Sequence, residues 1–529
     1  MRERLSHRAG LASGGAALSL AALLGAAAIA CGPAREQPDL VLVTVDTLRA
    51  DHLGAYGYAG ASTPTIDALA RRGRLFTQAT TPIPRTTPAL ASLLTGLWPQ
   101  HHGSREVAAP MDARTTLAEV LAGRGYATAG VSANEAAGAR QNLQRGFERF
   151  AGEADLPGDR AGFVTDRALE LARAAPREKP LFLWVHYTDP HYTYNPPGDF
   201  DPGPAAEPCR ALMAEVKSRR LSKGALQTDR GGVTSAALPA CVLLYDAEIA
   251  YADSEIGRLL GGLHDAGRLQ HAFVVFTADH GENLGEAGVY LEHGPSVHDA
   301  SLRVPLVIAG PGVEPGVDEG VARLEDLAPT LLALLQVPEA QRPRTDGADL
   351  SARIRGRAHG SDAVAFAESA SAFHAESVAF PFSGRIDARH CYNGERWSLC
   401  DERGGRTALY DHLADPDLRR DLAREHPDVL GALREARERW RPEQLRERAV
   451  RTPRWKLVEH PRLDGPPRRA LYDLAADPGE TRDASAEHPE VAAELGAQLE
   501  RWSAALDASP VPAPGATDIE ALRALGYVD

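Results

Sequence analysis

Residues 40–45 read Leu-Val-Leu-Val-Thr-Val and run directly into Asp46. A continuous apolar and β-branched run of this length is typical of a strand that is buried on both faces of a parallel sheet. Residues 181–185 (LFLWV) and 272–277 (AFVVFT) follow the same plan, and residues 304–309 (VPLVIA) form a fourth run. These runs predict the central strands of one large sheet.

Helical patterns separate the apolar runs. Residues 64–72 lie between a Thr-Pro start and a glycine, residues 116–121 end before a glycine, and residues 245–260 form a longer amphipathic segment. Strands that alternate with helices predict a doubly wound α/β domain with a mostly parallel sheet flanked by helices. We expect this domain to span residues 39–345.

The remainder, residues 346–529, contains a duplicated pattern. Residues 396–440 and 454–502 each carry a Trp, then Leu-Tyr-Asp, Asp-Pro and His-Pro in the same order. Each copy predicts a strand or hairpin, a turn and a helix. Two copies are too few for a solenoid, so we expect a smaller, duplicated α+β part that packs on the main sheet.

Composition excludes some function classes. The chain of 529 residues has 72 acidic and 58 basic residues, a net charge of −14, and 43% of its residues are hydrophobic. A nucleic-acid binder needs a basic surface to displace counterions, so we expect no nucleic-acid partner. The hydrophobic content is sufficient for a large core.

The N-terminus has the pattern of an export signal. Residues 1–30 combine a basic start with an Ala/Leu/Gly-rich stretch of moderate length, and Cys31 follows small residues. The segment resembles a bacterial lipoprotein signal. We therefore expect a signal peptide at residues 1–30, a lipid on Cys31, a linker at 31–38 and a body in the periplasm or cell envelope. That body would meet the membrane only through the N-terminal lipid; a plain exported protein is the alternative.

Four cysteines lie in the body of the chain: Cys209, Cys241, Cys391 and Cys400. In an oxidising compartment we expect Cys209 to pair with Cys241 and Cys391 with Cys400, each closing a short loop, with four reduced thiols as the alternative. Residues 193–240 are rich in Pro, Gly and charge. They are interpreted either as an insertion that shapes access for the substrate or as a plain surface loop.

Side chains of the kind that bind metals follow three of the apolar runs. Asp46 comes after the first run, His191 lies shortly after the second, and Asp279 and His280 follow the third. Ligands of open α/β sheets bind outside the carboxyl ends of the strands. Two carboxylates and an imidazole suit Zn²⁺ or Mn²⁺, while Ca²⁺ and Mg²⁺ are also possible.

Residues 86–96 read as the start of a helix, with Thr86 as N-cap and Pro88 in the first turn. The free N–H groups of a helix N-terminus favour a phosphate or sulfate. Alone, Thr86 would only cap the helix. Beside the predicted metal ligands it would become an activated hydroxyl that attacks phosphorus or sulfur. His191 and His293 would bind a second ion or protonate the leaving oxygen.

Several segments together resemble the alkaline phosphatase and sulfatase superfamily. In chain order these are residues 45–54, 86–96, 98–103, 189–191, 279–282, 292–294 and 302–305, followed by the Leu-Tyr-Asp and Asp-Pro motifs. The resemblance implies an alkaline phosphatase-like fold and a metal-dependent ester hydrolase. It places these residues at metal positions: Asp46, Thr86, Asp279 and His280. It also implies that Thr86 is the nucleophile and that His191 and His293 contact the substrate or a second metal.

The nucleophile region departs from typical sulfatases, which carry Cys-x-Pro-Ser-Arg with the Cys oxidised to formylglycine. Thr86 stands at the Cys position, and Ala89 and Leu90 replace the Ser and Arg. Thr47 replaces the second Asp of the metal pair, and residues 279–303 contain no Lys. A direct Thr nucleophile resembles the phosphodiesterases, phosphomutases and phosphoethanolamine transferases of the superfamily. The apolar residues Ala89 and Leu90 indicate that the substrate is bound by different contacts or that the activity is weaker.

The first hypothesis is therefore a metal-dependent hydrolase of phosphate mono- or diesters, or a phospho-group transferase, with Thr86 as nucleophile and one or two metal ions. The substrate would be a small molecule or a glycan or lipid ester. A sulfuric ester hydrolase is the alternative. A second alternative is a surface lipoprotein with little catalysis that binds an anionic glycan or a lipid head group.

Overall fold

The computed structural model describes residues 37–506, except for 108, 113, 159, 219–231, 361–362, 370–382, 387–388, 394–395, 403–405, 416–417 and 440–445. The predicted signal peptide (1–30) and Cys31 therefore lie outside the described residues, so export and lipidation stay predictions. None of the described helices combines the length and the apolar character needed to cross a bilayer.

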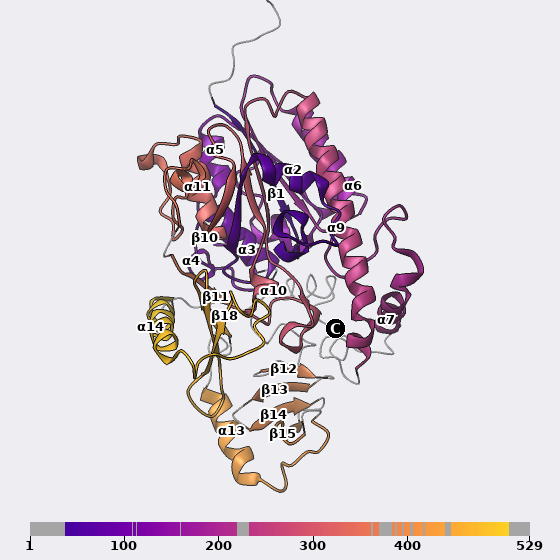
Figure 1. Ribbon diagram of the computed structural model, residues 1–529, viewed down its shortest axis with the longest axis vertical. Coiled ribbons are helices and arrows are strands. Elements are labelled where there is room, and N and C mark those ends of the chain that lie inside the picture. The colour runs from indigo at the N-terminus through magenta and orange to yellow at the C-terminus, as the bar shows by residue number, and fades with distance from the viewer. Residues whose placement is uncertain are drawn as a thin grey trace, which may run out of the picture. The chain divides into compact units, whose positions relative to one another are not determined.

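The described residues include one large sheet, which contains β1 and β10 (Figure 1). Its strand order is β10-β2-β9-β6-β1-β5-β3-β4. Its strands are β1 (Asp39–Val45), β2 (Arg74–Thr80), β3 (Ala127–Ser132), β4 (Arg149–Ala151), β5 (Leu181–Tyr187), β6 (Ala272–Ala278), β9 (Leu306–Ala309) and β10 (Gly316–Arg323). All four predicted runs are strands. β9 is antiparallel to β2 and β6, and the other pairs are parallel, which confirms the mostly parallel sheet.

The central strands are hydrophobic because both faces of the sheet are covered. Every residue of β1, β5 and β6 is buried. One group of helices that contact one another comprises α2 (Pro64–Arg72), α6 (Ala161–Ala174) and α9 (Val233–Asp265). A second group comprises α3 (Thr86–Thr95), α5 (Leu117–Gly123) and α11 (Leu327–Leu334). Both groups flank the sheet (Figure 1).

The remaining elements near this sheet are short, apart from α7. They are α4 (Pro99–His102), α7 (Glu207–Lys217), α10 (Asp299–Leu302), α12 (Ser351–Ile354) and the two-stranded pair β7 (Asn283–Leu284) and β8 (Tyr290–Glu292).

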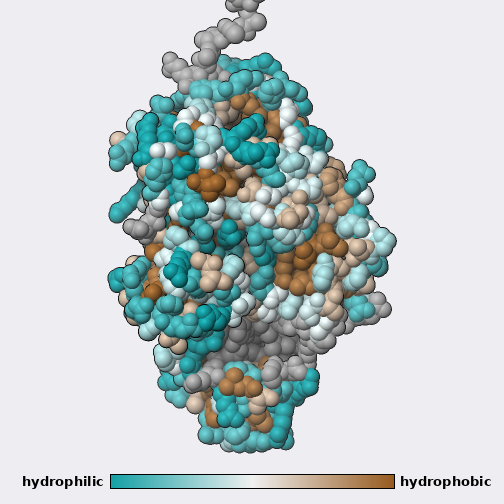
Figure 2. Space-filling view, in the orientation of Figure 1, coloured by the Kyte–Doolittle hydropathy of each residue, from teal (hydrophilic) through white to brown (hydrophobic). Residues whose placement is uncertain are grey.

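Helix α9 begins well before the predicted start at residue 245. It continues through Pro239, because Ala237, Ala240 and Leu244 extend its buried face toward the N-terminus. The segment interpreted as an insertion therefore contains α7 and the first turns of α9. Figure 2 shows apolar surface over this part of α9, where Leu243 is 42% exposed.

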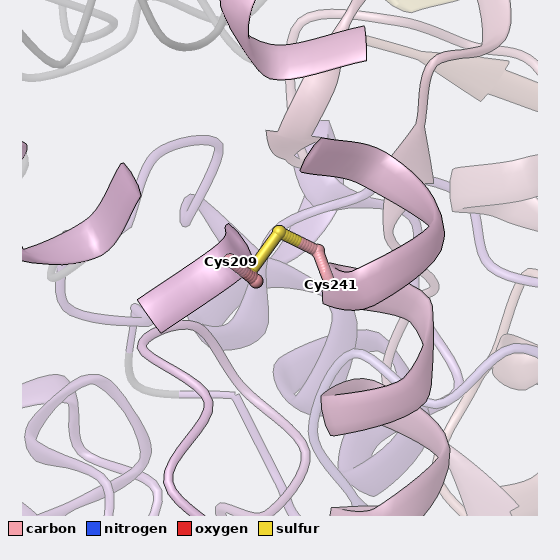
Figure 3. Close-up of a disulfide and its surroundings, with 2 residues drawn as sticks. All are labelled: Cys209 and Cys241. Carbon is pink, nitrogen blue, oxygen red and sulfur yellow. A yellow bond between two sulfur atoms is a disulfide. The ribbon is translucent and has the colours of Figure 1, made fainter. Parts of the chain in front are cut away.

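A disulfide joins α7 to α9. Cys209 and Cys241 are bonded, as predicted, and both are fully buried (Figure 3). Cys400 is also buried and disulfide-bonded, and it lies opposite Cys391 in a pair of antiparallel strands. The side chain of Cys391 lies outside the described residues.

The C-terminal part contains two antiparallel sheets with the orders β11-β16-β17-β18 and β12-β13-β14-β15. The elements are β11 (Ala365–Glu368), β12 (Ser383–Ile386), β13 (Arg389–Asn393), β14 (Trp397–Glu402), β15 (Arg406–Asp411), α13 (Pro427–Arg439), β16 (Arg448–Arg451), β17 (Trp455–His460), β18 (Arg468–Asp473) and α14 (Pro489–Leu506). Trp397 pairs with Asp411 and Trp455 with Asp473, so the two hairpins share one register. This shared register supports the proposed duplication.

A buried ion pair links the C-terminal part to the loop after α4. Arg105 donates two hydrogen bonds to Glu368, at 2.8 and 2.7 Å, and Arg446 lies 4.0 Å from the same carboxylate. Burial by itself raises the pKa of Glu368, but the two guanidinium groups outweigh burial and lower that pKa to about 2. The stabilisation from this contact is complete above the ordinary pKa of 4.5 and is lost as the pH falls toward 2.

The substitution Glu368→Gln should lower the free energy of unfolding at pH 7 by about 3 kcal/mol, because it removes the charged carboxylate to which the buried guanidinium of Arg105 is bonded. The loss should shrink when urea unfolding is repeated near pH 3. Glu425→Gln removes the exposed partner of Arg420 and is the control, with an expected change below about 0.5 kcal/mol. Equal losses of stability in the two variants would contradict a stabilising role of the buried Arg105–Glu368 ion pair.

Candidate metal and nucleophile site

Two neighbouring parallel strands bring two carboxylates together. Val45, the last residue of β1, pairs with Ala278, the last residue of β6, so Asp46 and Asp279 follow side by side at the carboxyl edge of the sheet. His280 comes next in the chain. The three side chains are fully buried, and one ligand atom from each lies within 4.8 Å of the others.

Each carboxylate has one oxygen held by the protein. Oδ2 of Asp46 accepts a hydrogen bond from Nδ2 of Asn134. Oδ1 of Asp279 accepts from the backbone N–H of His280 at 2.8 Å and of Thr47 at 3.3 Å. The other oxygens, Asp46 Oδ1 and Asp279 Oδ2, have no hydrogen-bond partner among the described residues. Two buried oxygens without a partner fit a cation between them.

Thr47 has a left-handed backbone, with φ of 53°, which a β-branched residue adopts only when its surroundings hold it there. The hydroxyl of Tyr245 donates to the carbonyl oxygen of Thr47 at 2.7 Å and accepts from the N–H of Arg49 at 3.0 Å. Helix α9 thus fixes the turn after β1. It thereby also fixes the backbone N–H of Thr47, which donates to Asp279.

His280 presents a nitrogen lone pair to the two carboxylates. Its Nδ1 lies 3.0 Å from the carbonyl oxygen of Gly281, which can only accept, so Nδ1 carries the proton. Its Nε2 lies 3.5 Å from Asp279 Oδ2 and 3.8 Å from Asp46 Oδ1. Burial, and then the charge of Arg85, lower the pKa of His280 well below its usual range. The ring is therefore neutral and suited to bind a metal.

Burial raises the pKa of both Asp46 and Asp279, and the charge of Asp279 raises the pKa of Asp46 further. Two buried carboxylates without a counter-charge are unfavourable, and a divalent cation would reverse this effect. The residues therefore fit a metal ion. In the part of the chain that the structure describes, this is the one such group of three, and neither His191 nor His293 belongs to it.

Thr86 is the first residue of α3, and the residue before it, Arg85, is the N-cap. The prediction that Thr86 caps the helix is therefore wrong. Arg85 has the extended backbone of an N-cap and its carbonyl oxygen accepts from the N–H of Ala89, which leaves the Thr86 side chain outside any cap. The hydroxyl of Thr86 instead lies 3.3 Å from Nε2 of His280 and is 1% exposed.

The two apolar residues that follow do not form an open surface. Ala89 and Leu90 are fully buried in the main hydrophobic core, so they anchor α3 instead of lining a cleft. Thr87 donates to the carbonyl oxygen of Ala136 at 2.6 Å, and Asn134 accepts from the N–H of Ala136 at 2.7 Å. The segment that holds Asp46 through Asn134 is therefore tied to the nucleophile helix.

The two predicted histidines lie beside the metal group. The ring of His293 stacks on His280, with centroids 4.4 Å apart, and His191 lies 5.2 Å from His293. Nδ1 of His293 lies 3.3 Å from Oε1 of the buried Glu282, which orients the ring. His186 contacts Thr44 at 2.9 Å through Nδ1, and burial followed by repulsion from His191 lowers its pKa to about 3.

Sequence reasoning did not assign four residues of this site: Arg85, Asn134, His186 and Glu282. All but Asn134 lie in or next to a segment that the motifs or the apolar runs already mark, but nothing in the local pattern of any of the four distinguishes it from a structural residue. Their roles depend on contacts across the fold, and position next to Thr86 was the one available signal for Arg85.

Known proteins point to one family. The sulfatase family model matches residues 38–337. Human arylsulfatase A is 26% identical over 479 residues, which cover 75% of this chain and 86% of that protein. The arylsulfatase of Clostridium perfringens is 24% identical over 369 residues, covering 58% and 76%. The structure of a phosphonate monoester hydrolase from Agrobacterium radiobacter has the same fold, with a TM-score of 0.61 at 22% identity, covering 89% and 96%.

The purified protein should bind one Zn²⁺ or Mn²⁺ per chain, and the substitution Asp279→Asn should abolish this binding because it removes the charge of a ligand. Metal content after dialysis and the melting temperature measure the effect. A hundredfold excess of metal over Kd should stabilise the wild type by about 2.7 kcal/mol and Asp279→Asn by little. Asp51→Asn, whose carboxylate pairs with Arg49 instead, is the control. Full metal binding by Asp279→Asn would exclude this site.

Proposed function

The chain belongs to the sulfatase family and is a hydrolase of sulfuric or phosphoric esters, and from this premise we propose that its nucleophile is the hydroxyl of Thr86 and that phosphate esters are its substrates. The metal would be held by Asp46, Asp279 and His280. Two carboxylates and a neutral imidazole favour Zn²⁺ or Mn²⁺.

The position of Thr86 carries this proposal. Thr86 is buried, its hydroxyl lies 3.3 Å from His280 Nε2, and it is the first residue of helix α3. A bound divalent cation would lower the pKa of this hydroxyl, as it does for bound water. The helix N-terminus favours the negative oxygens of the group being transferred.

The reaction follows as two displacements at phosphorus. The Thr86 hydroxyl gives its proton to solvent water and Oγ1 forms a bond to phosphorus while the bond to the leaving oxygen breaks. His191 or His293 donates a proton to that leaving oxygen. Thr86 has a single hydroxyl, so the ester on Oγ1 is released only when water attacks phosphorus. The same histidine then accepts a proton from the attacking water while the bond from Oγ1 to phosphorus breaks. Oγ1 takes a proton from solvent, which regenerates the Thr86 hydroxyl.

Glu282 supports the acid–base role of His293. Its carboxylate is fully buried beside Nδ1 of His293, so it stabilises the protonated ring and fixes the ring's orientation. The stacking of His293 on His280 places this ring against the metal group. His293 is therefore the better positioned of the two histidines to serve as the acid.

A sulfuric ester is the second candidate substrate, because the relatives with the longest matches are named as sulfatases. Human arylsulfatase A matches 75% of the chain, and a choline-sulfatase of Rhizobium meliloti is 27% identical over 60% of it. Against this candidate stands Thr86, which occupies the position where typical sulfatases carry the Cys that becomes formylglycine.

Thr86→Ala should lower kcat by roughly a thousandfold or more on a chromogenic phosphate ester, because it removes the attacking oxygen. Thr86→Ser keeps a hydroxyl at this position and should retain measurable turnover. Both variants should bind metal as the wild type does. Mass spectrometry of acid-quenched wild type should find phosphate on the peptide that contains Thr86.

The substrate assignment is tested with three chromogenic esters: a phosphate monoester, a phosphate diester and a sulfate. Release from a phosphate ester that depends on Thr86 would support the proposal. Turnover of the sulfate alone would favour the second candidate, and full activity of Thr86→Ala would exclude Thr86 as nucleophile.

A further inference from the structure

Arg85, directly before the nucleophile, forms a buried ion pair with Glu292. The guanidinium Nη1 donates to Glu292 Oε1 at 3.1 Å, and the side chains are 2% and 4% exposed. The same carboxylate oxygen accepts from the N–H of His293 at 3.1 Å. One carboxylate therefore connects the cation beside Thr86 to the histidine beside the metal group.

Gly294 shows that this turn is shaped around Arg85. A Cβ on Gly294 would lie 2.1 Å from Nε and 2.3 Å from Cζ of Arg85, and the φ of Gly294 is +99°. The guanidinium therefore lies against the backbone of Gly294, and any larger residue would displace it. The backbone N–H of His293 bonds to Glu292, and the ring of His293 stacks on His280. The Arg85–Glu292 pair is therefore connected to the metal group.

In the described segments around Thr86, Lys and Arg are scarce. Residues 125–135, 186–200 and 279–302, which form the loops and strand ends around the site, contain neither Lys nor Arg. Arg49 is engaged elsewhere, because its guanidinium bonds to Asp51 and to Glu286. Among the described Lys and Arg residues, Arg85 therefore supplies the permanent positive charge next to the nucleophile in the chain, and Glu292 pairs with it.

Carboxylates outnumber cations in the same region. Asp46, Asp279 and Glu282 are all fully buried, in addition to Glu292. A divalent cation would balance the first two, and the protonated ring of His293 would balance Glu282. An entering group with one negative charge can be accommodated by Arg85 and the N-terminus of α3, but a second negative charge would meet buried carboxylates in a medium that screens them weakly.

We propose that the Arg85–Glu292 pair determines the charge of the accepted substrate and selects esters whose transferring group carries a single negative charge. Phosphate diesters and sulfate monoesters belong to this class, whereas phosphate monoesters carry two charges at neutral pH. The proposal rests on the proposed function and narrows its substrate class. Glu292 acts as a specificity-determining residue because it withholds part of the positive charge that a dianion would need.

The test compares bis(4-nitrophenyl) phosphate with 4-nitrophenyl phosphate at pH 8, where the first carries one charge and the second two, and both release 4-nitrophenolate. The metal-loaded wild type should show the higher kcat/KM on the diester. Glu292→Gln should raise the monoester-to-diester ratio of kcat/KM by roughly tenfold or more, because it frees the charge of Arg85. Glu292→Asp keeps the charge and should keep the wild-type ratio.

Glu286→Gln is the matched control. It also removes one negative charge from the segment before His293, but Glu286 pairs with Arg49 and not with Arg85. It should leave the ratio within about twofold of the wild type. Melting temperatures show whether each variant is folded. If Glu292→Gln does not fold, Arg85→Gln replaces it in the test. Arg85→Gln should raise KM for the diester, and its turnover of the monoester should stay below its turnover of the diester. A wild-type preference for the monoester, or equal ratios for Glu292→Gln and Glu286→Gln, would overturn the proposal.

Binding to the Thr86→Ala variant separates this inference from the proposed function. Calorimetry should show tighter binding of dimethyl phosphate than of methyl phosphate, and adding Glu292→Gln should reduce or reverse the difference. If Thr86→Ala retains turnover, the proposed nucleophile is wrong, whatever the charge preference. If binding does not discriminate the two anions, the charge selection is wrong, whatever the nucleophile.

Discussion

Mutual repulsion between the buried carboxylates of Asp46 and Asp279 is the constraint on which the site depends. The parallel register of β1 and β6 brings them together, and burial makes both charges unfavourable. One oxygen of each is satisfied by a protein donor, from Asn134 or from backbone N–H groups, and the other has no partner among the described residues. A divalent cation is the natural solution to this arrangement, and it explains why neutral His280 completes the group.

The loop that carries His293 and Gly294 is held from the C-terminal part. Asp299, at the start of α10, pairs with Arg451 at 2.8 Å and with Lys456 at 2.9 Å. Burial alone would raise the pKa of Asp299, but these two cations lower it below its usual range. The antiparallel sheet that contains β16 and β17 therefore contributes to the geometry of the site, although none of its residues belongs to the metal group.

The strands were predictable because apolar and β-branched runs such as residues 40–45 are a local signal. The antiparallel direction of β9 could not be predicted, since its sequence resembles that of the parallel strands β1, β5 and β6. Only its pairing with β2 and β6 sets its direction. The early start of α9 could not be predicted because a proline such as Pro239 usually interrupts a helix. In the structure, the buried face of α9 and the disulfide from Cys241 to Cys209 of α7 stabilise the continuous helix.

By itself, the sequence determined the apolar strands, the helix that begins near Thr86 and the acidic and imidazole groups at the strand ends, because each is encoded by a few neighbouring residues. Tertiary structure alone decided which groups meet. Asn134 is 88 residues from Asp46, and Glu292 is 207 residues from Arg85. Contacts at such separations leave no periodicity or spacing in the chain. They exist because the parallel register brings the strand ends to one edge, where the loops then close around the same buried charges.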